Sequence, residues 1–281
     1  MREKSTIETD FYFSPESMIW RVNREQVLLL GGPRALLMQV AHPMVAEAVY
    51  EHSYVFQRPV KRLLRTLELT LALVYGTSEE VMQAARTINQ THHQAKGTLS
   101  ENVGSYKQGE IYDAQDPDLT LWVYATLVEG ALSGYERFIR PLTYAEKQAF
   151  YEDSALLVAL LGVKKTHLPP TIDALYTYMD EMMASGKIVV SRKAQAIAPY
   201  ILAQTSPLLK LLTFPSSRLT VGLLPEMLRE AYGFHYTHWE EMALSAFCNG
   251  TQRLVPHLPN TVRYVTQYRR AVASLNGRGV T

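Results

Sequence analysis

Two neighbouring segments in the first third of the chain carry residue types that could bind and activate a ligand. Arg62 and Thr66 are four residues apart among leucines, so in a helix they project from the same face. Further on, His92 is followed about one turn later by the small residues Ala95 and Gly97, which leaves room for a large flat group such as a porphyrin. A helical histidine is, however, more often a core or surface residue, and arginines among leucines usually form ion pairs or reach into solvent.

Consecutive helices are expected to position these residues. A turn at residues 75–78 separates a helix that begins at Pro59 from a second helix that runs to His92 and beyond. Thr77 and Glu80 have the spacing of a capping box, which predicts where the second helix begins. Upstream, residues 33–49 are apolar on most sides and predict a central helix that Pro43 kinks.

The rest of the chain predicts further helices, with capping boxes at Thr143 and Thr237, and no strong strand, repeat or low-complexity segment. The expected helices are residues 118–139, 143–161, 171–185, 197–202, 208–212, 225–231, 237–247 and 261–275. These features predict an all-α protein with a single compact multi-helix domain. Within it we expect an N-terminal arm and first helix (1–30), a helical domain (31–245) and C-terminal helices packed on that domain (246–281).

The composition narrows the class of protein. Hydrophobic residues make up 47% of the chain, enough for a sizeable core, and 28 Lys+Arg against 27 Asp+Glu give no broad field for nucleic acid. Cys248 is the single cysteine, which excludes an intrachain disulfide. The start of the chain has no signal-peptide pattern, and its longest uncharged run is too short to span a bilayer. We therefore expect a cytoplasmic protein without a transmembrane segment.

Several other chemistries lack their motifs. No histidine has a glutamate three residues before it, as a di-iron helical bundle requires. His235 and His238 are a lone pair without an evident third zinc ligand, and neither a phosphate-binding glycine loop nor a Gly-x-Ser-x-Gly elbow is present. These absences argue against a di-iron, zinc, phosphate-binding or serine hydrolase site.

Ordered motifs over residues 20–245 resemble the latex clearing proteins, or rubber oxygenases, and the MpaB-type fungal oxygenases. The matching pieces are Gly31-Gly32-Pro33-Arg34-Ala35-Leu36-Leu37, Ala41-His42-Pro43-Met44-Val45-Ala46, His52-Ser53, Arg62-x-x-x-Thr66, Tyr75-Gly76, His92 with Gly97, Asp113-Ala114-Gln115-Asp116-Pro117, Leu121-Trp122-Val123, Leu223-Leu224-Pro225, Arg229 and Tyr232-Gly233. The resemblance implies haem b on a globin-like helical core and, in the rubber oxygenases, oxidative cleavage of an isoprenoid carbon–carbon double bond.

Carried over by position, the resemblance makes His92 the iron ligand and places Arg62 and Thr66 near the haem as catalytic residues. Arg65 stands where rubber oxygenases have a lysine that can close over the iron. Arg34 and His42, in the two earlier motifs, are further candidates for cofactor binding. No confident counterpart of the family's glutamate base is evident, and Glu47 and Glu51 are the nearest candidates.

Together these expectations describe a haem b-dependent oxygenase that acts with dioxygen on a small, apolar, alkene-bearing molecule. Two alternatives stay open. One is a sensor or storage protein that binds haem or an apolar ligand without turnover, and the other is a small-molecule enzyme that has lost haem.

Overall fold

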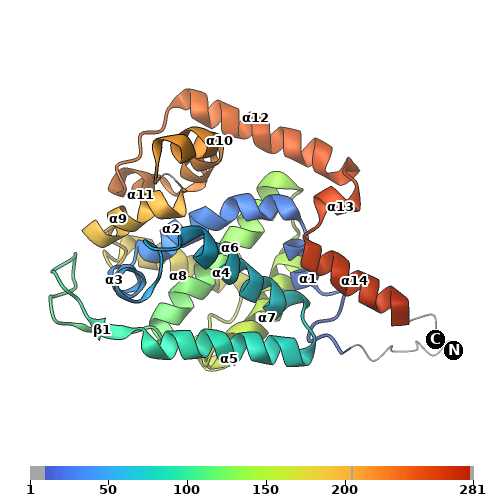
Figure 1. Ribbon diagram of the computed structural model, residues 1–281, viewed down its shortest axis with the longest axis horizontal. Coiled ribbons are helices and arrows are strands. Elements are labelled where there is room, and N and C mark those ends of the chain that lie inside the picture. The colour runs from blue at the N-terminus through green and yellow to red at the C-terminus, as the bar shows by residue number, and fades with distance from the viewer. Residues whose placement is uncertain (1–9, 204, 279–281) are drawn as a thin grey trace.

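The computed structural model describes residues 10–203 and 205–278, and most of these residues are helical (Figure 1). The all-α prediction is confirmed, while a globin-like core and the three-part division of the chain stay predictions. The α-helices of the described residues are α1 Met18–Asn23, α2 Gly32–Val40, α3 Pro43–His52, α4 Pro59–Tyr75, α5 Ser78–Gln94, α6 Pro117–Phe138, α7 Tyr144–Leu160, α8 Ile172–Ala184, α9 Arg192–Ile201, α10 Pro207–Leu223, α11 Glu226–Ala231, α12 His238–Leu254, α13 Asn260–Arg263 and α14 Thr266–Arg278. Short 3₁₀ helices cover Gln26–Gly31, Lys165–His167 and Val255–His257.

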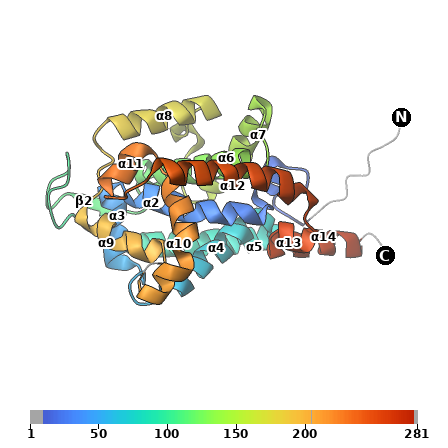
Figure 2. The ribbon, with the colours of Figure 1, turned by 90° about the horizontal axis from the view of Figure 1, so that it is seen from above.

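The long helix α6 runs through the middle of the fold (Figures 1 and 2). Asp116 caps its start by accepting the N–H groups of Asp118 and Leu119. Several of its turns are buried on more than one side, as expected for a helix enclosed by others. Trp122, fully buried, donates its indole N–H to the carbonyl of Met38 at 3.2 Å and so ties α6 to α2.

Three capping boxes begin helices where the sequence predicts them. The hydroxyl groups of Thr77, Thr143 and Thr237 each accept the backbone N–H three residues on, and the glutamate there returns a bond to the threonine N–H. Each box supplies partners to two backbone N–H groups that the helix itself leaves unpaired. The starts of α5, α7 and α12 are therefore confirmed.

The kinked helix expected around Pro43 is two helices, so that prediction is wrong in detail. Helix α2 ends at Val40 and α3 begins at Pro43, with His42 between them in an extended conformation. The ring of a proline disfavours the helical conformation of the residue before it, which explains a break instead of a kink. The ring Nδ1 of His42 accepts the N–H of Met44 at 3.3 Å and caps α3.

Two other expectations are corrected. A small antiparallel hairpin pairs β1 (Lys96–Thr98) with β2 (Ile111–Asp113), where no strand was expected, because three-residue strands carry no periodic signal. The single C-terminal helix is broken at Tyr264, where Val265 donates its N–H to the carbonyl of Arg24. Residues 1–9 of the expected N-terminal arm lie outside the described residues.

Candidate functional site

Helices α4 and α5 form a pair joined by the turn at Gly76 and Thr77. Near the turn they share a small apolar cluster around Leu73, Val81 and Ala84. Because the chain reverses at a short turn, the start of α4 and the end of α5 lie at the same end of the pair. Figure 1 shows the two helices close together at the turn and further apart toward the end that holds the start of α4 and the end of α5. The sequence predicts the site at that end.

His92 lies in the last turn of α5 and is half-buried. Burial lowers the pKa of its imidazole, so the neutral form, with a free nitrogen lone pair, is favoured at neutral pH. No side chain or backbone group of the described residues forms a hydrogen bond or ion pair with the ring. Its neighbour His93 is exposed and contacts Gln115 through Nδ1 at 3.1 Å, as expected for a residue on the outer face.

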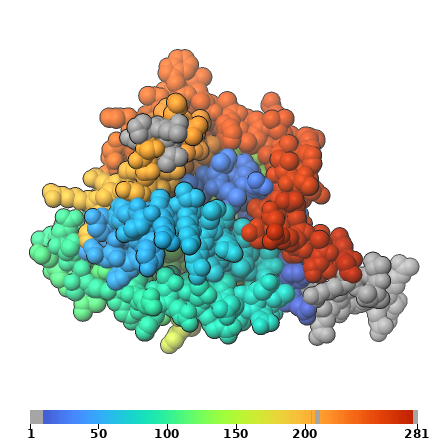
Figure 3. Space-filling model, in the orientation of Figure 1, coloured from blue at the N-terminus to red at the C-terminus, as the bar shows by residue number. Residues whose placement is uncertain are grey.

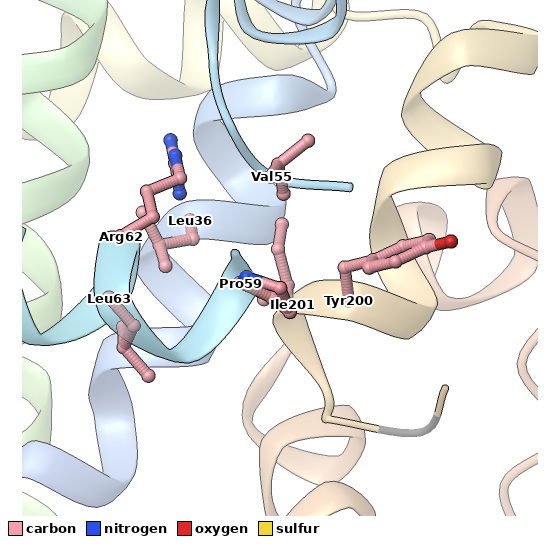
Figure 4. Close-up of a pocket in the computed structure, with 7 residues that line it drawn as sticks. All are labelled: Leu36, Val55, Pro59, Arg62, Leu63, Tyr200 and Ile201. Carbon is pink, nitrogen blue, oxygen red and sulfur yellow. The ribbon is translucent and has the colours of Figure 1, made fainter. Parts of the chain in front are cut away.

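Arg62 occupies the corresponding end of α4 and is also half-buried. Loss of solvation lowers the pKa of its guanidinium, and within the described part of the chain the group has no hydrogen bond or ion pair. It borders a small cavity of about 20 Å³ whose walls are otherwise mostly apolar. The lining residues are Leu36, Val55, Pro59, Arg62, Leu63, Tyr200 and Ile201 (Figure 4).

The cavity lies between the start of α4 and the end of α9. Figure 4 shows the Arg62 guanidinium directed away from Tyr200 and Ile201. The cavity has room for about one water molecule. Typical ligand pockets are far larger, at roughly 300–1,000 Å³. The cavity is therefore too small to hold a haem group.

Thr66 and Arg65 lie in a more exposed environment than Arg62. The Thr66 hydroxyl donates to the carbonyl of Arg62 at 3.0 Å, which leaves its oxygen lone pairs available to a donor. Both Thr66 and Arg65 are exposed. Arg65 borders an open hollow on the outer face of α4, beside Leu64 and separate from the cavity at Arg62. The structure therefore does not bring Arg65 together with Arg62.

Arg34 and His42 are both buried and both have partners within the protein. The guanidinium of Arg34 forms a two-pronged ion pair with Glu129 of α6 and donates to the carbonyl of Leu223 at 2.7 Å. The Nε2 atom of His42 lies 3.0 Å from the hydroxyl of Tyr106, and its Nδ1 atom caps α3. These contacts give both residues structural roles, and their part in cofactor binding stays a prediction.

The space beside Gly97 is filled by Tyr112, not by an open approach for a ligand. Gly97 faces Tyr112 across the hairpin, and a Cβ atom at Gly97 would lie 2.6 Å from the tyrosine Oη. That hydroxyl group is 3.0 Å from Nε2 of His52. The interpretation of Gly97 as room for a flat group is therefore wrong at this position, and its smallness accommodates Tyr112.

Glu47 is a buried carboxylate with a cationic partner that the sequence did not predict. Glu47 of α3 is 4% exposed, and Nζ of Lys193 lies 2.8 Å from its Oε1 atom and 2.6 Å from Oε1 of Glu51. The backbone N–H of Ser100 also donates to Glu47 at 3.1 Å. Two of these residues were candidates for a base, but nothing in the sequence pointed to Lys193, which lies far along the chain.

His92 and Arg62 each carry donor atoms that suit one part of a haem group. A neutral imidazole without a partner among the described residues could hold a haem iron, and a desolvated guanidinium without an anion there could hold a carboxylate such as a propionate. Among the residues described, no group of three or more His, Cys, Asp and Glu side chains could hold a metal ion alone. A lone histidine such as His92 could still hold a haem iron, because a porphyrin supplies four nitrogen ligands of its own.

Comparison with protein families gives a match over residues 20–253, most of the chain. The matching family is described as "ER-bound oxygenase mpaB/B'/Rubber oxygenase, catalytic domain". Among curated proteins, the chain is similar to an uncharacterized protein of Mycobacterium bovis and another of Mycobacterium tuberculosis, each 30% identical over 139 residues. The match covers 48% of this chain, and the chain spans about half the length (52%) of these relatives.

No solved structure matches the chain. Separately, among the described residues, no helix combines the length and apolar character needed to traverse a bilayer.

Proposed function

Because the chain belongs to the family of MpaB and rubber oxygenase catalytic domains, we propose that it is a haem b-dependent oxygenase with His92 as the iron ligand. The family is one of oxygenases, and the haem, the ligand and the substrate are the parts proposed. The proposed substrate is a small, apolar molecule with an alkene group, such as a short isoprenoid.

The environment of His92 supports its assignment as the iron ligand. His92 combines a position near the end of α5, partial burial, a lowered pKa and no protein partner within the described residues. His93, the adjacent histidine, is exposed and contacts Gln115. Coordination requires a neutral imidazole with a free lone pair, and of these two residues His92 meets that requirement better.

The haem, when bound, supplies an iron centre that activates dioxygen toward the substrate. Arg62 holds an anionic group of the cofactor, because its desolvated charge has no partner within the described residues. The Thr66 hydroxyl oxygen accepts a hydrogen bond from the cofactor or substrate, while its own O–H keeps donating to the carbonyl of Arg62. The apolar side chains around Arg62, including Leu36, Val55 and Ile201, exclude water from this end of the helix pair.

The ligand assignment is tested by absorption spectroscopy of protein expressed with a haem precursor. The wild-type protein and His93→Ala are expected to show the same Soret band and axial ligation, whereas His92→Ala loses bound haem or changes its ligation. His93→Ala is the matched control, because it removes an adjacent imidazole from the same helical turn. A His92→Ala protein with an unchanged Soret band and unchanged ligation contradicts the assignment.

The activity is tested by incubating the haem-loaded protein with short isoprenoids and dioxygen, followed by analysis of carbonyl products. Arg62→Ala is expected to lose most of its turnover, and Arg65→Ala, three residues further along α4, is expected to retain it. A stable complex of the wild-type protein with dioxygen and no carbonyl product would favour a sensor or store. Absence of a Soret band in every preparation would favour an enzyme without haem.

A further inference from the structure

The outward face of α4 mixes exposed apolar side chains with exposed cations. Val60 is 63% exposed and Leu64 is 59% exposed, and both lie on the same face because they are four residues apart. Lys61 and Arg65, also four residues apart and both exposed, lie next to them. These four residues, with Glu68, border an open hollow of about 460 Å³.

Within the described residues, the exposed cations at the start of α4 form no ion pairs. In the parts of the chain that the structure describes, neither Lys61 nor Arg65 forms an ion pair, and the same holds for the exposed Arg58 at the start of the helix. Glu68 is the one acidic residue bordering the hollow, so this face carries a local excess of positive charge. The chain as a whole is almost neutral, at +1, so the excess is a property of this face.

A second exposed apolar segment lies on the same side of the molecule. Leu211, Leu212 and Phe214 of α10 are 74%, 67% and 57% exposed. Helix α10 begins shortly after the end of α9, which borders the same cavity as the start of α4 (Figure 4). Figure 3 shows both segments on the face turned toward the viewer, α4 in cyan and α10 in orange. We name the surface formed by Val60, Lys61, Leu64, Arg65, Leu211, Leu212 and Phe214 the α4–α10 face.

We propose that the α4–α10 face docks on the surface of an anionic lipid bilayer. Such a bilayer surface binds exposed apolar side chains that lie next to lysine and arginine. The apolar groups enter the boundary of the acyl chains, while the cations contact lipid phosphates. This binding does not require haem or turnover, so it stands apart from the proposed reaction.

A second copy of the chain fits this surface less well. A two-fold dimer places the same patch of each copy against the other, so Lys61 and Arg65 would face the same cations across the interface. Like charges brought together without counter-ions oppose association. An anionic bilayer instead provides the opposite charge that the face lacks.

Flotation with lipid vesicles tests the proposal on the full chain. The wild-type protein is expected to float with vesicles of phosphatidylcholine mixed with phosphatidylglycerol, to float less with phosphatidylcholine alone, and to be released by high salt. Leu64→Asp and Leu212→Asp are each expected to weaken binding to the mixed vesicles about tenfold, because each places a charge at the apolar boundary. Lys61→Glu is expected to weaken it without removing any apolar contact.

The matched control is Ile111→Asp, which introduces the same charge at a residue that is 78% exposed on strand β2, outside the α4–α10 face. It is expected to bind vesicles like the wild-type protein. The proposal is overturned if the wild-type protein does not float with anionic vesicles, or if Ile111→Asp loses as much binding as Leu64→Asp. A lipid-free dimer in sedimentation experiments that Leu64→Asp dissociates would also overturn it, because the face would then join two copies.

Discussion

Replacement of Gly97 by alanine is expected to destabilise the protein by about 1–3 kcal/mol, the usual effect of adding a methyl group to a filled site. The added Cβ atom would lie 2.6 Å from Oη and 2.9 Å from Cζ of Tyr112, closer than such atoms approach in folded proteins. Tyr112 cannot swing away easily, because it is only 2% exposed and its hydroxyl lies 3.0 Å from His52. The strain must therefore be relieved by moving the hairpin or by breaking this contact.

A double-mutant cycle separates this clash from other effects of the substitution. Urea unfolding would be measured for the wild-type protein, Gly97→Ala, Tyr112→Ala and the double variant. Without the tyrosine ring, Gly97→Ala is expected to be neutral or slightly stabilising, since glycine loses more conformational freedom on folding than alanine. The coupling free energy between the two sites should therefore be about 1–3 kcal/mol.

Gly250 provides the control, because apart from its chain neighbours and the nearby backbone of its own helix no atom lies within 4 Å of the position that its Cβ would take. It belongs to α12, where Gly250→Ala is expected to stabilise the protein by about 0.5–1 kcal/mol. The reasoning is refuted if Gly97→Ala leaves the unfolding free energy unchanged, or if it costs the same with and without the ring of Tyr112.

Two further predictions concern buried polar groups. Burial, with a smaller effect of Lys187, lowers the pKa of His42 from 6.5 to about 4, so the unfolded chain binds a proton between these pH values and the folded protein does not. Stability from this group is thus present above pH 6.5 and falls by about 3 kcal/mol as the pH drops toward 4. His42→Asn, which can still cap α3 through Met44, should flatten this part of the pH–stability curve, and an unchanged slope would contradict the assignment. Lys193→Met leaves the carboxylate of Glu47 buried without its cation and should cost about 3–5 kcal/mol in urea unfolding. Adding Glu47→Gln to that variant should recover part of the loss, and no recovery would show that the pair is not the cause.

Local patterns were sufficient to predict much of the helical framework. A capping box involves residues three positions apart, so Thr77, Thr143 and Thr237 could be identified without knowing where any helix packs. The order of short motifs predicted the family, which the match over residues 20–253 confirms. The sequence likewise drew attention to His92 and Arg62, whose side chains lack partners among the described residues.

Only the tertiary structure determines which residues contact the other candidates. Arg34 pairs with Glu129, His42 contacts Tyr106, and Tyr112 fills the space beside Gly97. No spacing rule links these residues, because each pair meets only after separate elements have packed together. Hydrogen bonds within a helix join residues a turn apart and are encoded locally, whereas the partner of a buried charge or the occupant of a small space depends on how distant elements meet.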